Sequence, residues 1–113
     1  MFAPALVLAQ TAPPPRTQAP SPPPRARELN TEAVERCRLG AYTEGIAKAR
    51  EALALREKAL GPGHALTAES LHTLAECLRE SGEYTEARPL FERALAIRDK
   101  TLGPEHEIGR AHV

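Results

Sequence analysis

The chain of 113 residues has no tryptophan, and its other aromatic residues are only Phe2, Tyr42, Tyr84 and Phe91. A core with so few aromatic side chains is filled mainly by leucine and alanine, which favour helices. The length leaves room for one small domain at most. The sequence also lacks any run of 18 apolar residues, which excludes a complete transmembrane helix within it.

Net charge is absent too, because 15 Lys and Arg residues balance 15 Asp and Glu residues. This balance gives no reason to expect nucleic acid or an anionic membrane as a partner. Cys37 and Cys77 have neither CxxC spacing nor a histidine cluster, so we expect ordinary half-buried helix cysteines rather than a metal site or a disulfide. The GxGxxG, GxSxG and HExxH motifs are missing. The sequence therefore predicts no enzymatic activity, no cofactor and no metal site.

The first 27 residues differ in character from the rest. Residues 1–12 form an apolar leader whose small residues fit the pattern of a signal-peptide cleavage site, but the basic start of a signal peptide is missing. We therefore expect either the remnant of a signal peptide or the tail of another segment, such as a membrane span. The first alternative implies a periplasmic or exported protein, and otherwise the protein is cytoplasmic. Residues 13–27 are a proline-rich linker, which we expect to be disordered and extended.

The remaining residues contain an internal repeat. The stretch ALALREKALGPGH at 52–64 returns as ALAIRDKTLGPEH at 94–106, and YTE at 42–44 returns at 84–86, always 42 positions later. Self-similarity at such a period indicates stacked units that bury their apolar faces against one another. His64 and His106 recur in this way; a metal role competes with a loop role in which the ring satisfies backbone groups at the next helix start, and we favour the loop role.

Each unit has the pattern of a helical hairpin. In the second unit, apolar residues three and four apart predict a helix over 65–81 that Gly82 ends. A second helix runs from Tyr84 to about Leu102 and ends before Gly103 and Pro104. Small Ala75 and Ala87 allow the two helices to approach closely. The layer between them is expected to be filled by Leu71, Leu74, Leu78, Tyr84 and Phe91.

The pattern resembles the tetratricopeptide repeat, in the long 42-residue form found in kinesin light chains and many bacterial proteins. The resemblance is carried by Leu71, Leu74, Ala75, Leu78, Gly82, Tyr84, Ala87, Phe91, Ala94 and Leu95. It implies an all-α solenoid of about two helical hairpins, at 28–64 and 65–106. The first hairpin is degenerate, since Glu32 and Arg36 occupy core positions, Gly45 replaces an alanine and Ala49 replaces an aromatic residue.

In this family the first helix of each hairpin lines a concave groove that binds a peptide or a partner protein. The resemblance therefore implies a partner-binding surface on two helices, with no nucleic acid and no small-molecule cofactor as partner. The expected partner-binding residues are Glu69, His72, Thr73, Glu76 and Arg79 in the second hairpin, and Asn30, Val34, Cys37 and Arg38 in the first.

The last residues do not continue the repeat. Residues 107–113 read EIGRAHV, which matches a translation of a common sequencing adapter, so we expect read-through there and a fragment whose further repeats are missing. Three functional alternatives stay open. The chain is a protein-binding module, the regulatory part of a larger enzyme such as a bacterial protein kinase or peptidase, or an oligomerisation spacer.

Overall fold

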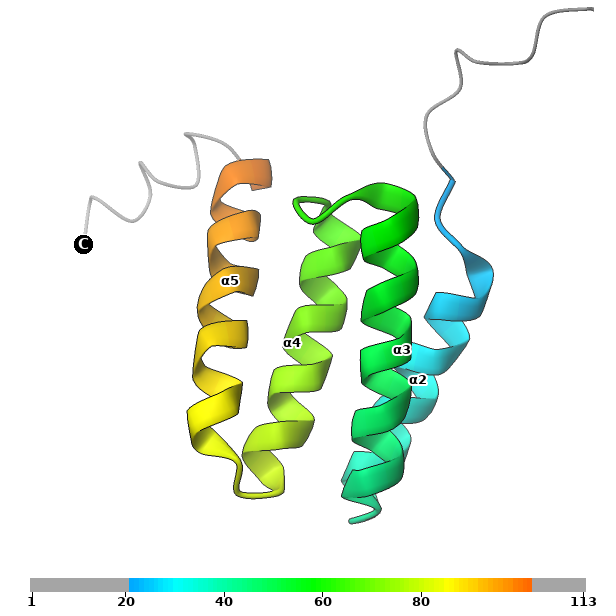
Figure 1. Cartoon of the computed structure of the whole chain (residues 1–113), viewed down its shortest axis with the longest axis vertical. Coiled ribbons are helices and arrows are strands. Elements are labelled where there is room, and N and C mark those ends of the chain that lie inside the picture. Colours follow the sequence, from blue (N-terminus) through cyan, green and yellow to red (C-terminus); the bar gives the residue numbers. More distant parts are fainter. Residues whose placement is uncertain (1–20, 103–113) are drawn as a thin grey trace, which may run out of the picture.

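The computed structural model describes residues 21–102, which contain four α-helices and no β-strand. The helices are α2 (Pro24–Arg38), α3 (Tyr42–Leu60), α4 (Ala65–Glu80) and α5 (Tyr84–Leu102). They form two hairpins, α2–α3 and α4–α5, that pack side by side (Figure 1). The predicted all-α fold of helical hairpins is confirmed. None of these four helices is long and apolar enough to cross a membrane.

Some predictions lie outside the described residues. These are the leader, the linker up to residue 20, the role of His106 and the adapter-like tail. The end of the predicted linker is described, and it differs from the expectation. Helix α2 begins at Pro24 instead of residue 28, because proline is well suited to the first turn of a helix, where no intrahelical amide bond is needed. The buried side chain of Ala26 then packs with Leu29 and with Ala52 of α3.

Both hairpins turn at a glycine with left-handed backbone angles. Gly40 follows α2 with a φ of 88°, and Gly82 follows α4 with a φ of 94°, a region that costs glycine little. The amide of Glu83, the next residue, donates to the Leu78 carbonyl at 2.7 Å, and the first hairpin contains the equivalent bond. These bonds satisfy carbonyl groups at the helix ends. The recurring glycines therefore end the first helix of each hairpin, as predicted for Gly82.

One apolar core connects the two hairpins. Ala75 and Ala87 lie where α4 and α5 approach each other, which confirms their predicted role, and Phe91 packs against the same cluster from its edge. Full burial of a leucine such as Leu74 or Leu78 stabilises the fold by about 1.5–3 kcal/mol. The buried residues of this cluster come from all four helices: Ala33, Ala49, Leu74, Ala75, Leu78 and Ala87.

Two apolar residues of α5 are more exposed than the repeat pattern suggests. Tyr84 is 66% exposed, so the prediction that it fills the layer between α4 and α5 is wrong, and Leu95 is 55% exposed. The counterpart of Leu95 in the first hairpin, Leu53, is partly buried and packs against two apolar clusters that include residues of α4 and α5. Within residues 21–102 no helix follows α5 to cover Leu95 in the same way.

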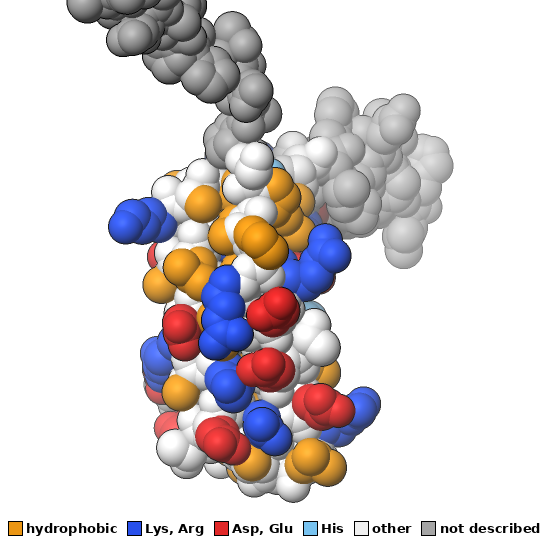
Figure 2. All heavy atoms as spheres, turned by 90° about the vertical axis from the view of Figure 1, so that its right-hand side faces the viewer, with side chains coloured by type: hydrophobic (Ala, Val, Ile, Leu, Met, Phe, Trp, Pro, Cys, Tyr) orange, Lys and Arg blue, Asp and Glu red, His pale blue; other side chains and the backbone are white. Residues whose placement is uncertain are grey.

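The first hairpin uses ion pairs where the second uses leucines. Glu32 and Arg36 replace the apolar residues of the repeat, and each pairs with α3: Lys48 Nζ lies 3.0 Å from Glu32, and Glu44 lies 3.5 Å from Arg36. The hydrogen bond from Lys48 holds the pKa of the Glu32 carboxyl below its usual range. Figure 2, viewed from the side on which α2 and α3 lie, shows acidic and basic side chains interleaved over this surface.

The loop between the hairpins is fixed by side chains of the next helix and its cap. The Leu66 amide donates to His64 Nδ1 at 3.0 Å, and Thr67 Oγ1 donates to the Gly61 carbonyl at 2.8 Å. The imidazole of His64 thus satisfies one of the free amides at the start of α4. The predicted loop role of His64 is confirmed.

Candidate functional site

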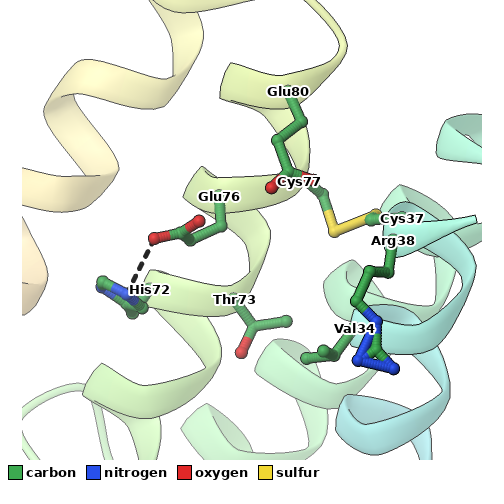
Figure 3. A pocket seen from close by; sticks show the side chains of 8 residues that line it. All are labelled: Val34, Cys37, Arg38, His72, Thr73, Glu76, Cys77 and Glu80. Atoms are coloured by element: carbon green, nitrogen blue, oxygen red, sulfur yellow. Dashed lines mark ion pairs between the residues drawn. A yellow bond between two sulfur atoms is a disulfide. The ribbon is translucent and has the colours of Figure 1, made fainter. Parts of the chain in front are cut away.

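A hollow of about 240 Å³ opens between α2 and α4, the first helices of the two hairpins (Figure 3). Helix α2 supplies one wall and α4 the other. The lining consists of Val34, Cys37, Arg38, His72, Thr73, Glu76, Cys77 and Glu80. This position agrees with the expectation that the two first helices share one surface.

Six of the nine candidates lie at this hollow, and three do not. The six that line it are Val34, Cys37, Arg38, His72, Thr73 and Glu76. Glu69 lies apart and pairs with Arg56, at 2.7 Å. The Arg79 guanidinium lies over the Phe91 ring at 5.7 Å, where it faces a second hollow between α4 and α5. The remaining candidate, Asn30, lines a separate shallow hollow with Val34 and Arg38.

Asn30 and Thr73 are joined to each other. Asn30 Nδ2 donates to Thr73 Oγ1 at 3.0 Å, and both residues are buried, with 9% and 7% of their surface exposed. Ser70 Oγ donates to Asn30 Oδ1 at 3.3 Å, and Arg56 Nη1 donates to Ser70 Oγ at 3.1 Å. This chain of bonds links α2, α3 and α4 below the hollow. These hydrogen bonds stabilise the packing of the two walls, because separating the walls would leave buried polar groups without hydrogen-bond partners and so cost free energy.

The charges at the hollow divide into paired and unpaired groups. His72 Nε2 lies 3.2 Å from one carboxylate oxygen of Glu76, and Arg79 lies 2.9 Å from the other. The side chains of Arg38 and Glu80 make no ion pair or hydrogen bond with any residue in the described part of the chain. Arg38 belongs to α2 and Glu80 to α4. The two walls therefore present unpaired charges of opposite sign, beside the half-exposed Val34.

A disulfide bond between Cys37 and Cys77 joins the two walls of the hollow (Figure 3). The Cα atoms of the two residues are 5.6 Å apart, and 40 residues separate them in the sequence. The expectation of two ordinary cysteines without a disulfide is wrong. When two hairpins stack with a 42-residue period, residues about one period apart lie on neighbouring helix turns. CxxC spacing is a local signal, so its absence does not argue against a disulfide between such residues.

Three residues important here were not predicted as site residues: Glu80, Cys77 and Arg56. A signal for each was available in the sequence. Glu80 follows Glu76 by four residues and so lies on the same helix face, and Cys77 lies 40 residues after Cys37. Arg56 belongs to the repeated stretch and recurs as Arg98. In the structure Arg56 is only 3% exposed and bonds both to the Glu69 carboxylate and to the Leu66 carbonyl.

The residues at the hollow offer hydrogen bonds, charges and a small apolar surface. Within residues 21–102 no group of three or more His, Cys, Asp or Glu residues is placed to hold a metal ion. The two cysteines are bonded to each other, so neither is a free thiol. This set of side chains suits recognition of another molecule by shape and charge.

Comparison with known proteins gives the family. The profile described as Tetratricopeptide repeat matches residues 33–100 and, in a second overlapping match, residues 71–111. No curated protein matches the chain. Repeats of this family generally mediate protein–protein interactions and are not catalytic themselves. With helical hairpins that turn at matched glycines and a profile match over more than half of its length, the chain belongs to the tetratricopeptide repeat family.

Proposed function

We propose that this protein is an interaction module that binds an extended peptide segment of a partner protein in the hollow between α2 and α4. The observation that carries the proposal is the pair of unpaired charges, Arg38 and Glu80, on opposite walls of that hollow. Val34, on the α2 wall, is 45% exposed, which leaves an apolar surface available to a ligand.

The size of the hollow favours a peptide over a small molecule. Pockets for drug-sized ligands and cofactors typically enclose about 300–1,000 Å³, whereas this hollow holds about 240 Å³. Such a space accommodates one or two side chains, while the rest of an extended chain runs along the surface. A small apolar side chain would contact Val34, an acidic group would approach Arg38 and a basic group would approach Glu80.

The form of the repeat is consistent with the long, kinesin-light-chain-like type, since both copies of the inter-hairpin stretch keep the 42-residue period. Modules of this kind also serve as regulatory parts of larger enzymes, such as bacterial protein kinases or peptidases, and the peptide would then come from the same enzyme or its substrate. The sequence of the parent gene distinguishes a free interaction protein from this alternative.

Peptide selection tests the proposal. Peptides selected from a random display library against the oxidised 113-residue protein are measured by fluorescence anisotropy against variants. Arg38→Glu and Glu80→Lys are expected to weaken binding by about tenfold each. Arg98→Glu and Glu51→Lys, at exposed and unpaired positions on α5 and α3, serve as controls and leave the affinity within about twofold.

Charge exchange in the peptide makes the test specific. A selected peptide whose acidic residue is replaced by lysine is expected to bind Arg38→Glu better than it binds the unaltered protein, since like charges repel and opposite charges attract. Equal losses for the hollow variants and the control variants would reject this hollow as the binding surface.

A further inference from the structure

We propose that the Cys37–Cys77 disulfide is a redox-sensitive brace that holds α2 against α4 and thereby controls whether the hollow between them exists. The bond joins the two helices that form the walls, and both of its cysteines line the hollow. Within the part of the chain that the structure describes, it is the single covalent link between the hairpins apart from the loop that follows α3. Cleavage of this bond therefore acts directly on the separation of the two walls.

We expect the first hairpin to depend on the brace because it buries fewer leucine side chains than the second. The second hairpin buries Leu74 and Leu78 between its helices, whereas the equivalent positions of α2 hold Glu32 and Arg36. The side chains of Glu32 and Arg36 are 42% and 43% exposed, and ion pairs at such exposure contribute little to stability. The large side chain that α2 buries is Leu29, beside several alanines.

A glycine of α3 makes room for the brace. Gly45 lies inside α3, where the second hairpin has Ala87. A Cβ atom at position 45 would overlap the Cys37 Sγ atom and would lie 3.1 Å from the Ala33 carbonyl oxygen. Glycine in a helix interior destabilises it by about 0.5–1 kcal/mol relative to alanine. The sequence thus has a helix-weakening residue at a position of α3 where a side chain would overlap the sulfur atom.

We expect a small reductant to approach the disulfide through the hollow or during local opening of α2. Cys37 and Cys77 are buried, with 4% and 2% of their surface exposed, and both line the hollow (Figure 3). A dithiol reductant cleaves the bond between the two Sγ atoms, each cysteine takes up one proton, and the dithiol leaves as its own cyclic disulfide. The reduced chain keeps both cysteines as thiols and loses the link between α2 and α4.

Reduction is expected to release α2 while the second hairpin stays folded. A disulfide that closes a loop of this length restricts the unfolded chain substantially, and α4 and α5 keep their own core without it. The wall carrying Val34 and Arg38 would then leave the hollow. Loss of peptide binding on reduction rests on the proposed function, whereas release of α2 does not.

Hydrogen exchange read by mass spectrometry tests the brace in the full 113-residue protein, oxidised and after treatment with dithiothreitol. The amides of Pro24–Arg38 are expected to exchange at least about tenfold faster on reduction, with a much smaller change in Tyr84–Leu102. The thermal midpoint is expected to fall by at least about 10 °C. A variant with Cys37→Ala and Cys77→Ala resembles the reduced protein and does not respond to dithiothreitol.

Three results would overturn the proposal. The first is free thiols in protein prepared under oxidising conditions, detected by mass after alkylation. The second is unchanged exchange in α2 after complete reduction, and the third is equal acceleration in α2 and α5. If α2 is released on reduction but no peptide binds the oxidised protein, the brace stands and the proposed function fails; if peptide affinity is the same in both states, the control of binding by the brace is rejected.

Discussion

Leu53 and Leu95 occupy the same place in successive repeats, 42 residues apart, and yet their surroundings differ. Leu53 is partly buried and packs against two apolar clusters that include residues of α4 and α5, whereas Leu95 is 55% exposed on α5. The same side chain on the same kind of helix is therefore partly buried or largely exposed according to whether another helix lies beside it. In a stacked-repeat fold the neighbour decides the burial.

This pair gives a matched test of the packing. Leu53→Ala is expected to lower the free energy of unfolding by about 2 kcal/mol or more, because it leaves a space between the hairpins. Leu95→Ala removes the same atoms from an exposed site and is expected to change it by less than about 0.5 kcal/mol. Urea denaturation of the oxidised variants measures both values, and equal losses would contradict the arrangement of α3 and α4.

The buried bond between Asn30 and Thr73 gives a second prediction. Asn30→Ala leaves the Thr73 and Ser70 hydroxyls without this partner, so it is expected to cost about 1–2 kcal/mol of unfolding free energy. Thr31→Ala, at the exposed neighbouring position, is the control and should be close to neutral. In a double-mutant cycle with Thr73→Val, costs that simply add would show that the two side chains do not interact.

Gly45 gives a third prediction, which concerns its relation to Cys37. Gly45→Ala is expected to destabilise the oxidised protein by about 1–3 kcal/mol, because the new methyl group competes with the Cys37 Sγ atom for space. In a protein that already carries Cys37→Ala and Cys77→Ala the sulfur is gone and only the contacts with the Ala33 carbonyl oxygen and the amide nitrogen of residue 37 remain, so the same change is expected to cost less. Thermal unfolding followed by circular dichroism gives both costs. A cost that is independent of the cysteines would show that the sulfur does not lie against residue 45.

The ion pair between Lys48 and Glu32 gives a fourth prediction, on pH. The Lys48 hydrogen bond lowers the pKa of Glu32 in the folded protein, so this carboxylate contributes stability above its unfolded pKa, and the contribution is lost as pH falls through the lower, folded pKa. The effect is small because the group is exposed. Lys48→Met is expected to move the pKa of Glu32 upward in a carbon-13 NMR titration, and an unchanged pKa would argue against the pair.

The sequence pattern predicts the helices well because their signals are local. The apolar residues on one face of 65–80 and the left-handed glycine at position 82 each act through neighbouring residues, and α4 follows these signals closely. The cap by His64 is local in the same sense, since it reaches only to the Leu66 amide. Such features depend little on how the hairpins stack.

The features that were missed depend on how the hairpins stack. Tyr84 is 66% exposed, and its own helix periodicity carries no sign of this. The disulfide between Cys37 and Cys77 requires the offset of α2 against α4, which fixes residues 40 positions apart as neighbours. The candidate Asn30 was assigned to ligand binding because it is polar on a first helix, yet that polarity serves a buried bond to α4.

The most direct test of peptide binding between α2 and α4 is amide chemical-shift mapping. The oxidised, nitrogen-15-labelled protein is titrated with a peptide selected for binding to it. The largest shifts are predicted at Val34–Arg38 of α2 and His72–Glu80 of α4, around the hollow, and they should be lost in the Arg38→Glu variant. Shifts concentrated on α3 and on the outer face of α5, or shifts that persist unchanged in that variant, would contradict the proposed binding site.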